Sequence, residues 1–191
     1  MGAILAGGES RRMGANKALL EVDGVPIIQH VASAMTAVFE DVRIVADDAS
    51  PYAFLNLQVT RDVWKKTGPL GGLHAALHSA VAPRVFVLSC DTPFVTPDLI
   101  QFILEQPARS PITVVSDENG VQPLCGLYDR SLLREVETRL KAGNHRLLAL
   151  LEALGASIIP LNTAHSWYRK DLLANINTPA EYHALRSGKV S

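Results

Sequence analysis

The chain has few of the features that mark secreted, membrane or nucleic-acid-binding proteins. Its 191 residues include only two cysteines, Cys90 and Cys125, which excludes both a disulfide framework and a cysteine-based zinc motif. No leader of signal-peptide type precedes the first apolar segment, and no apolar run is long enough to cross a bilayer. We therefore expect a cytoplasmic protein without a membrane partner.

An excess of charge of one sign is also lacking. The net charge is −1 at pH 7, whereas nucleic-acid binding usually shows as a basic patch or a high isoelectric point. Nucleic acid is therefore not an expected partner. With 48% hydrophobic and 19% charged residues, the chain has enough apolar material for a core. Its length predicts a single domain over residues 1–191.

The most informative segment lies near the N-terminus. An apolar run, residues 2–5, leads directly into Gly7 and Gly8, and Arg12 and Lys17 follow within ten residues. Paired glycines let backbone N–H groups approach an anion, and basic side chains supply charge. The spacing fits neither the Walker pattern nor G-x-G-x-x-G. In a near-neutral protein this segment predicts a site for one small anion, such as a nucleoside triphosphate; the alternative is a solvated surface turn.

Strand-like and helix-like segments alternate along the chain, which predicts an α/β fold with a mostly parallel sheet and right-handed crossovers. Ligands in such sheets bind beyond the carboxyl ends of the strands. We expect strands at 2–5 (in the middle of the sheet), 42–46, 57–60, 85–89, 112–115, 121–128 and 157–160, and helices at 26–39, 69–80, 96–106, 131–142, 146–154 and from Pro179.

Asp91 is the strongest candidate for a metal ligand. It follows the apolar run 85–89 and precedes Thr92 and Pro93. Magnesium binds one or two protein carboxylates and takes its other ligands from water and phosphate oxygens. A carboxylate that caps a turn is the alternative. Because the basic glycine loop is expected at the same edge of the sheet, we favour Mg²⁺ binding.

Three further segments carry polar or glycine-rich patterns. Glycines around Pro69 let a phosphate approach a helix start, although tight packing would need them too. Asp62 follows the predicted strand 57–60 and is either near the ligand or a solvated loop residue. Asn177 precedes Thr178-Pro179, where helix capping is the simplest role. Arg146, at a predicted helix start, is either functional or solvated.

These segments resemble the motifs of nucleotidyltransferases, and of the molybdenum cofactor guanylyltransferases in particular. Residues 5–17 match L-A-G-G-x-S-x-R-M-G-x-x-K, and further matches are C-D-T-P-F at 90–94, G-P-L-x-G at 68–72 and N-x-N-T-P at 175–179. The resemblance implies a Rossmann-like three-layer sandwich of nucleotidyltransferase type. It also implies transfer of GMP from GTP to the terminal phosphate of molybdopterin, with or without molybdenum, and release of pyrophosphate.

The resemblance also implies a role for each matching residue. The catalytic group would be Arg12, Lys17 and Asp91, with Asp91 as the Mg²⁺ ligand. The nucleotide would contact the residues Leu5, Ala6, Gly7, Gly8, Lys17, Asp62, Gly68, Pro69, Leu70 and Asp91. The pterin would lie near Arg146, Asn175 and Asn177. Proteins of cofactor synthesis or acceptor molybdoenzymes would be the protein partners.

Two departures and three rivals accompany this interpretation. The family commonly has asparagine after the second strand, where this chain has Asp47 and Asp48, either of which could accept from guanine. It often has proline in place of Ser89, a change not expected to matter. A cytidylyltransferase, a sugar nucleotidyltransferase and a non-catalytic nucleotide-binding carrier are the rivals. Gly7-Gly8 and the segment 68–72 favour guanine over cytosine.

Two other sets of reactive residues are assigned no function. His74 and His78 have a spacing that suits zinc, but no third ligand is evident from the sequence, and we expect both on the solvent face. Cys90 ends a predicted buried strand with no neighbouring base, so we do not expect a nucleophile.

Overall fold

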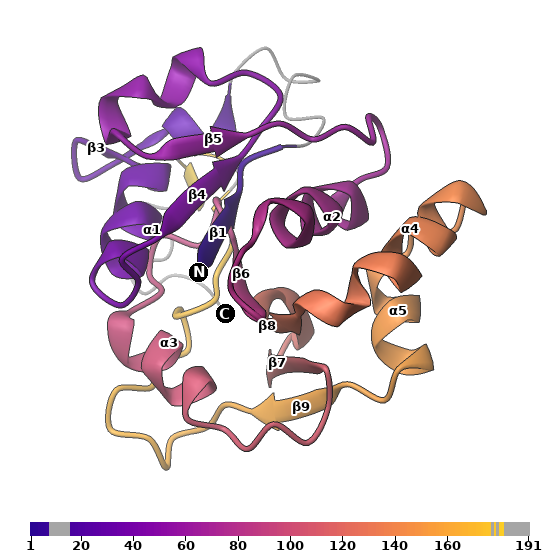
Figure 1. Ribbon diagram of the computed structural model, residues 1–191. Coiled ribbons are helices and arrows are strands. Elements are labelled where there is room, and N and C mark those ends of the chain that lie inside the picture. Colours follow the sequence, from indigo (N-terminus) through magenta and orange to yellow (C-terminus); the bar gives the residue numbers. More distant parts are fainter. Residues whose placement is uncertain (8–15, 177, 179, 182–191) are drawn as a thin grey trace.

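The computed structural model describes residues 1–7, 16–176, 178, 180 and 181 of the chain. One seven-stranded sheet runs through its centre (Figure 1). In spatial order its strands are β5 (Gln58–Thr60), β4 (Val42–Val45), β1 (Gly2–Leu5), β6 (Arg84–Ser89), β8 (Gly120–Asp129), β7 (Ile112–Asp117) and β9 (Ser157–Pro160).

The strand directions bring several carboxyl ends to one edge of the sheet. β5, β4, β1 and β6 are parallel, whereas β8 runs antiparallel to both β6 and β7. Leu5, the last residue of β1, is in register with Val45 on one side and Ser89 on the other. β1 is buried along its whole length between β4 and β6, which confirms its predicted interior position.

Helices cover both faces of the sheet, so the predicted three-layer α/β architecture is confirmed (Figure 1). α1 (Ile27–Thr36) and α3 (Pro97–Leu104) pack on one face. α2 (Pro69–Ser79), α4 (Leu133–Lys141) and α5 (Leu147–Ala153) pack on the other. Within the described residues, no helix is long and apolar enough to span a bilayer.

Among the described residues, the apolar pattern of the sequence did not predict five short elements, two strands and three 3₁₀ helices. A two-stranded hairpin turns at Asp23 and Gly24, both with positive φ. Pro26 ends that hairpin and occupies the N-cap position of α1 without a side-chain hydrogen bond. The helix itself begins one residue later than predicted and ends at Thr36 instead of near Phe39. The short elements are β2 (Glu21–Val22), β3 (Val25–Pro26) and the 3₁₀ helices η2 (Lys17–Leu19), η3 (Ser50–Leu55) and η4 (Arg130–Leu132).

The predictions for the cap of α3, for the two histidines of α2 and for the last helix have different outcomes. Thr96 caps α3 as predicted, because its hydroxyl oxygen accepts from the backbone N–H of Leu99. The expectation that both histidines of α2 face solvent is wrong for His74, which is buried where α4 packs against α2. The helix expected from Pro179 lies outside the described residues.

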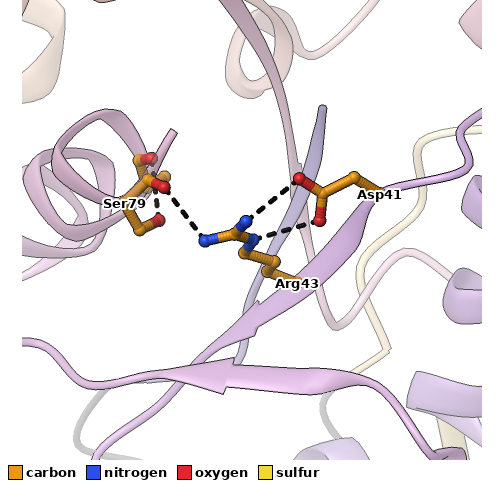
Figure 2. Close-up of polar contacts among 4 residues, drawn as sticks. Asp41, Arg43 and Ser79 are labelled. Atoms are coloured by element: carbon orange, nitrogen blue, oxygen red, sulfur yellow. Dashed lines mark hydrogen bonds and ion pairs between the residues drawn. The ribbon is translucent and has the colours of Figure 1, made fainter. Parts of the chain in front are cut away.

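Arg43 fastens β4 to the C-terminal end of α2 (Figure 2). Its Nε and Nη2 donate to the two carboxylate oxygens of Asp41, at 3.0 and 3.1 Å. Its Nη1 donates to the carbonyl oxygen of Ser79, the last residue of α2, at 2.9 Å. A cation at this helix end satisfies an otherwise unpaired carbonyl and complements the helix dipole. The contact therefore helps to fix α2 along the sheet.

Candidate active site

Two of the predicted site segments lie side by side at the carboxyl edge of the sheet. The backbone N–H of Ala6 donates to Val45 O at 2.9 Å, and that of Cys90 donates to Leu5 O at 3.1 Å. These bonds continue the ladders past the strand ends and place Ala6 and Gly7 next to Asp91. Gly7 is exposed at this edge, as a phosphate-binding backbone would have to be. Gly8 and Arg12 lie outside the described residues.

Asp91 presents a half-buried carboxylate at this edge. The Ser89 hydroxyl donates to its Oδ1 at 2.5 Å, and the Thr92 hydroxyl donates to the carbonyl oxygen of Ser89 at 3.0 Å. Proline at position 89 could not make the first of these bonds, so the departure at Ser89 bears directly on the predicted metal ligand. A single oriented carboxylate with hard oxygen donors fits the limited protein ligation that Mg²⁺ prefers.

Lys17 is brought to the same edge through Asn16 and Tyr52. The Asn16 Nδ2 donates to the Tyr52 hydroxyl at 3.0 Å, and that hydroxyl donates to Ala6 O at 3.3 Å. Burial raises the pKa of Tyr52, so its hydroxyl stays protonated and able to donate. The Asn16 Oδ1 also caps η2, which begins at Lys17. The segment that carries Lys17 is therefore tied to the end of β1.

The pKa of the Cys90 thiol depends on burial and on two charged residues nearby. The pKa of Cys90 is raised to about 12, mainly by burial and in smaller part by the Asp91 carboxylate, while the Lys17 ammonium opposes the shift. The charges of Asp91 and Lys17 therefore both act on this one thiol. Since the thiol stays protonated at neutral pH, Cys90 is not an activated nucleophile.

Asp62 lies against the first turn of α2. The backbone N–H of Trp64 donates to its Oδ1 at 2.8 Å. Its Oδ2 is 2.7 Å from the position that a Cβ on Gly71 would occupy. Burial is the main cause that raises the pKa of Asp62, so it is not a fully solvated loop residue. The structure thus brings Asp62 together with the helix start at Gly68, Pro69 and Leu70, where Gly68 has a left-handed φ of 64°.

The two aspartates after β4 differ in their surroundings. The Oδ1 of Asp48 accepts from the backbone N–H of Ser50 at 3.0 Å, which gives Asp48 a local structural role. Asp47 is exposed, and its charge contributes to the raised pKa of Asp62. Of the two, Asp47 is therefore the one whose charge acts on Asp62.

A cleft of about 240 Å³ opens beside Asp91. Asn175 lies on its wall, and the backbone N–H of the next residue, Ile176, donates to Asp91 O at 2.9 Å. The structure thus brings Asn175 to Asp91. Asn177 lies outside the described residues. Arg146 is exposed at the N-terminal end of α5 and is not among the residues that line the cleft.

The cleft is also lined by Gln122, Pro123 and Leu124, which we did not predict as site residues. They lie where β8 bulges, because the pairing with β7 jumps between Val114 and Val115. Such irregularities often aim side chains at a functional site. The available signal was Pro123 inside the predicted strand 121–128, because proline within a strand disturbs the hydrogen-bond ladder and often marks a bulge.

The fold and the family comparison define the class of the protein: it is a nucleotidyltransferase. The model of the MobA-like NTP transferase domain matches residues 2–158. The chain belongs to that family.

Named relatives agree with this assignment. The chain is 34% identical over 184 residues to a "Probable molybdenum cofactor guanylyltransferase" of Carboxydothermus hydrogenoformans, covering 96% of this chain and 93% of that protein. It is 32% identical to the molybdenum cofactor guanylyltransferase of Syntrophotalea carbinolica, covering 96% and 89%. The crystal structure of molybdopterin-guanine dinucleotide biosynthesis protein A from Archaeoglobus fulgidus shares the fold, with a TM-score of 0.81 at 24% identity over 99% of both chains.

Proposed function

We propose that this protein transfers GMP from GTP to the terminal phosphate of molybdopterin and releases pyrophosphate. The observation that carries the proposal is the shared location of Lys17, Asp91 and the Ala6-Gly7 backbone at one sheet edge, beside a cleft lined by Asn175. The names of the relatives support the choice of GTP and molybdopterin as substrates.

The reaction needs little proton transfer from the protein. An oxygen of the molybdopterin phosphate attacks the α-phosphorus of GTP, the bond to the bridging oxygen of the β-phosphate breaks, and pyrophosphate leaves. The second pKa of a phosphomonoester is about 6, so the attacking oxygen is already ionised at neutral pH. The barrier comes from the repulsion between two anions and from charge on the leaving group, which positioning and fixed positive charge reduce.

We assign most of this positioning and positive charge to residues of the chain itself. The backbone from Leu5 to Gly8 receives the nucleotide, and Asp62 with the first turn of α2 binds next to it. Lys17 neutralises the β- and γ-phosphates, and we assign Arg12 the same role. Asp91 would hold Mg²⁺, which supplies Lewis-acid polarisation of the phosphate oxygens when bound. The Ser89 hydroxyl orients the Asp91 carboxylate for that task.

We assign recognition of the guanine base to the residues that follow β4 at the carboxyl edge of the sheet. We assign Asp47 as the acceptor for the guanine N1–H and exocyclic amino group, because Asp48 is engaged by the backbone of Ser50. A carboxylate cannot form the same pair of contacts with cytosine, which lacks the N1–H donor. The Asp47→Ala variant is therefore expected to lose selectivity for GTP over CTP, with a smaller effect on the rate with CTP.

Pyrophosphate release by the purified full chain tests the proposal. GTP, CTP and ATP are each supplied with and without molybdopterin and with and without Mg²⁺. We expect release only when GTP, molybdopterin and Mg²⁺ are all present. Release with CTP instead would identify a cytidylyltransferase. Release without molybdopterin would mean that water accepts the nucleotidyl group and would contradict molybdopterin as the acceptor. No release under any condition would overturn the enzymatic proposal.

A further inference from the structure

A separate cluster of metal-ligating side chains lies where α4 packs against α2. His74 and His78 are one helical turn apart on α2, and Glu137 reaches them from α4. One ligand atom from each residue lies within 4.8 Å of the others. Glu137 is the third ligand that we did not identify from the sequence, because it is far from both histidines along the chain and only the packing of the two helices brings it near.

The surroundings of His74 are unusual for a buried polar ring. His74 is 4% exposed, and among the described residues its Nδ1 has no hydrogen-bond partner. Its Nε2 is 3.4 Å from Glu137 Oε1. A good N–H···O bond has a donor–acceptor distance of about 2.7–3.2 Å, so this contact alone compensates poorly for the burial. A stronger interaction at Nε2, in place of this long contact, would compensate better for burying the ring, while Nδ1 would keep the proton of a neutral imidazole.

The separation of these two atoms matches two ligands of one ion. Zinc binds imidazole nitrogen and carboxylate oxygen at about 2.0–2.2 Å in tetrahedral geometry, which places the two donor atoms roughly 3.4 Å apart. The observed distance is 3.4 Å. His78 is exposed and its ring stacks on that of His74 at 5.7 Å between centroids, so rotation of its side chain brings a third donor to the same ion.

We propose that His74, His78 and Glu137 bind one divalent transition-metal ion, with zinc as the best-fitting metal. Imidazole and carboxylate ligands suit zinc, whereas magnesium prefers oxygen ligands alone, so this site differs chemically from the one at Asp91. The fourth position faces solvent, where His78 is exposed and Glu137 half-exposed, and takes a water molecule. The ion would fasten α2 to α4.

Trp64 provides a local reporter for the site. Its ring lies edge-on to His74, with 6.0 Å between ring centroids. Trp167 is the other of the chain's two tryptophans, and it packs instead on His165 and Phe102. The Trp167→Phe variant therefore leaves Trp64 as the sole tryptophan. A paramagnetic ion bound to His74 quenches its fluorescence.

The test uses tag-free, chelator-treated full chain titrated with Co²⁺ in the Trp167→Phe background. We expect one equivalent of Co²⁺ to produce the visible absorption of a four-coordinate ion and to quench Trp64. Zinc should displace the cobalt. At a free zinc concentration about 100 times Kd, the melting temperature should rise by roughly 5–10 °C.

Two variants at accessible positions identify the ligands without disturbing the core. His78→Ala and Glu137→Gln should abolish the cobalt absorption and weaken zinc binding at least about 10–100-fold, the cost of losing even an outer-shell partner. His145→Ala is the matched control and should bind normally. The proposal is wrong if wild type gives no cobalt absorption, or if both ligand variants retain it. It is equally wrong if Asp91→Asn removes the signal, which would place the ion in the cleft.

Discussion

The backbone N–H of Ile176 donates a hydrogen bond of 2.9 Å to the carbonyl oxygen of Asp91. Ile176 is fully buried against Val22 and Ile27, so the segment that carries Asn175 is docked at the candidate metal ligand. The segment assigned to molybdopterin and the residue assigned to Mg²⁺ are thus joined by a main-chain hydrogen bond. A change on the Asn175 side therefore acts within one hydrogen bond of the residue assigned to Mg²⁺.

Asp91 gives the most direct test of the metal assignment. Asp91→Asn keeps the shape of the side chain and removes the charge, so kcat/KM for GTP should fall by about 10²–10³-fold or more. Ser89→Ala removes only the hydroxyl that orients Asp91 and should cost less, about 10-fold, with a higher requirement for Mg²⁺. Steady-state pyrophosphate release over a Mg²⁺ titration measures both. Equal, near-normal rates in the two variants would remove Asp91 from the mechanism.

Asn175 tests the acceptor side of the cleft. Because its side chain lines the wall next to Asp91, Asn175→Ala should raise KM for molybdopterin about 10-fold, the cost of roughly one hydrogen bond to a charged group. KM for GTP should hardly change. Arg146→Ala, measured alongside, tests the other described residue that we assigned to the pterin. An effect on KM for GTP alone would contradict the assignment of Asn175.

The sequence predicted the layered fold and most of the sheet because its strands are short, apolar and clearly bounded. Gly2–Leu5 is confirmed in its exact bounds and interior position. The hairpin at Asp23-Gly24 was missed because each of its strands is too short to show a period. The reversed direction of β8 was also not predicted, since apolar runs do not encode strand direction.

The site was partly predictable for a similar reason. Residues at strand ends, such as Gly7 and Asp91, could be placed on one edge from topology alone. Gln122 and Leu124 could not, because a register shift between β7 and β8 exposes them to the cleft. Glu137 was missed because α4 meets α2 only through tertiary packing. The sequence around Glu137 contains no pattern that would indicate its proximity to His74.

Asp62 predicts an effect of pH on stability. Burial raises its pKa in the folded state, so between the ordinary pKa of about 3.8 and the raised value the folded chain binds more protons than the unfolded one. Its contribution to stability is therefore highest at low pH and decreases as pH rises through this window. Asp62→Asn, which keeps the oxygen that accepts from Trp64, should raise the melting temperature at pH 7.

The gain from Asp62→Asn should shrink as pH falls toward 4, and KM for GTP should rise about 10-fold if the carboxylate contacts the nucleotide. Thermal melts between pH 4.5 and 7, paired with GTP kinetics, measure both effects. A variant that is less stable than wild type at pH 7 would show that the charge of Asp62 stabilises the fold and that burial is not its dominant effect.

We predict that Tyr52 positions Lys17, because its hydroxyl joins Asn16 to the end of β1. Tyr52→Phe removes the bonds to Asn16 and Ala6, which should cost about 1 kcal/mol of unfolding free energy and lower kcat/KM for GTP about 5–10-fold. Arg43→Met is the control, because it should also lose about 1 kcal/mol while leaving kinetics unchanged (Figure 2). Urea unfolding and GTP kinetics on both variants distinguish positioning from stability. If both variants lose activity equally, Tyr52 acts only through stability.

Gly71 and Gly72 are adjacent in α2, but the same substitution to alanine is expected to be destabilising at Gly71 and nearly neutral at Gly72. A Cβ at Gly71 would meet Thr67 Oγ1, Asp62 Oδ2 at 2.7 Å and the carbonyl oxygen of Trp64 at 2.9 Å. The backbone oxygen cannot easily move. Gly71→Ala should therefore lower the unfolding free energy by about 1–3 kcal/mol and raise KM for GTP by displacing Asp62.

A Cβ at Gly72 would lie 3.1 Å from Leu5 Cδ1, the end of a flexible side chain. The gain in helix propensity, about 1 kcal/mol, should offset that contact, so Gly72→Ala is expected within about 1 kcal/mol of wild type. Urea unfolding ranks the two variants, and GTP kinetics show whether the Gly71 substitution also reaches the site. Should both variants prove equally stable with the same KM for GTP, Asp62 would not be held against the first turn of α2 as described.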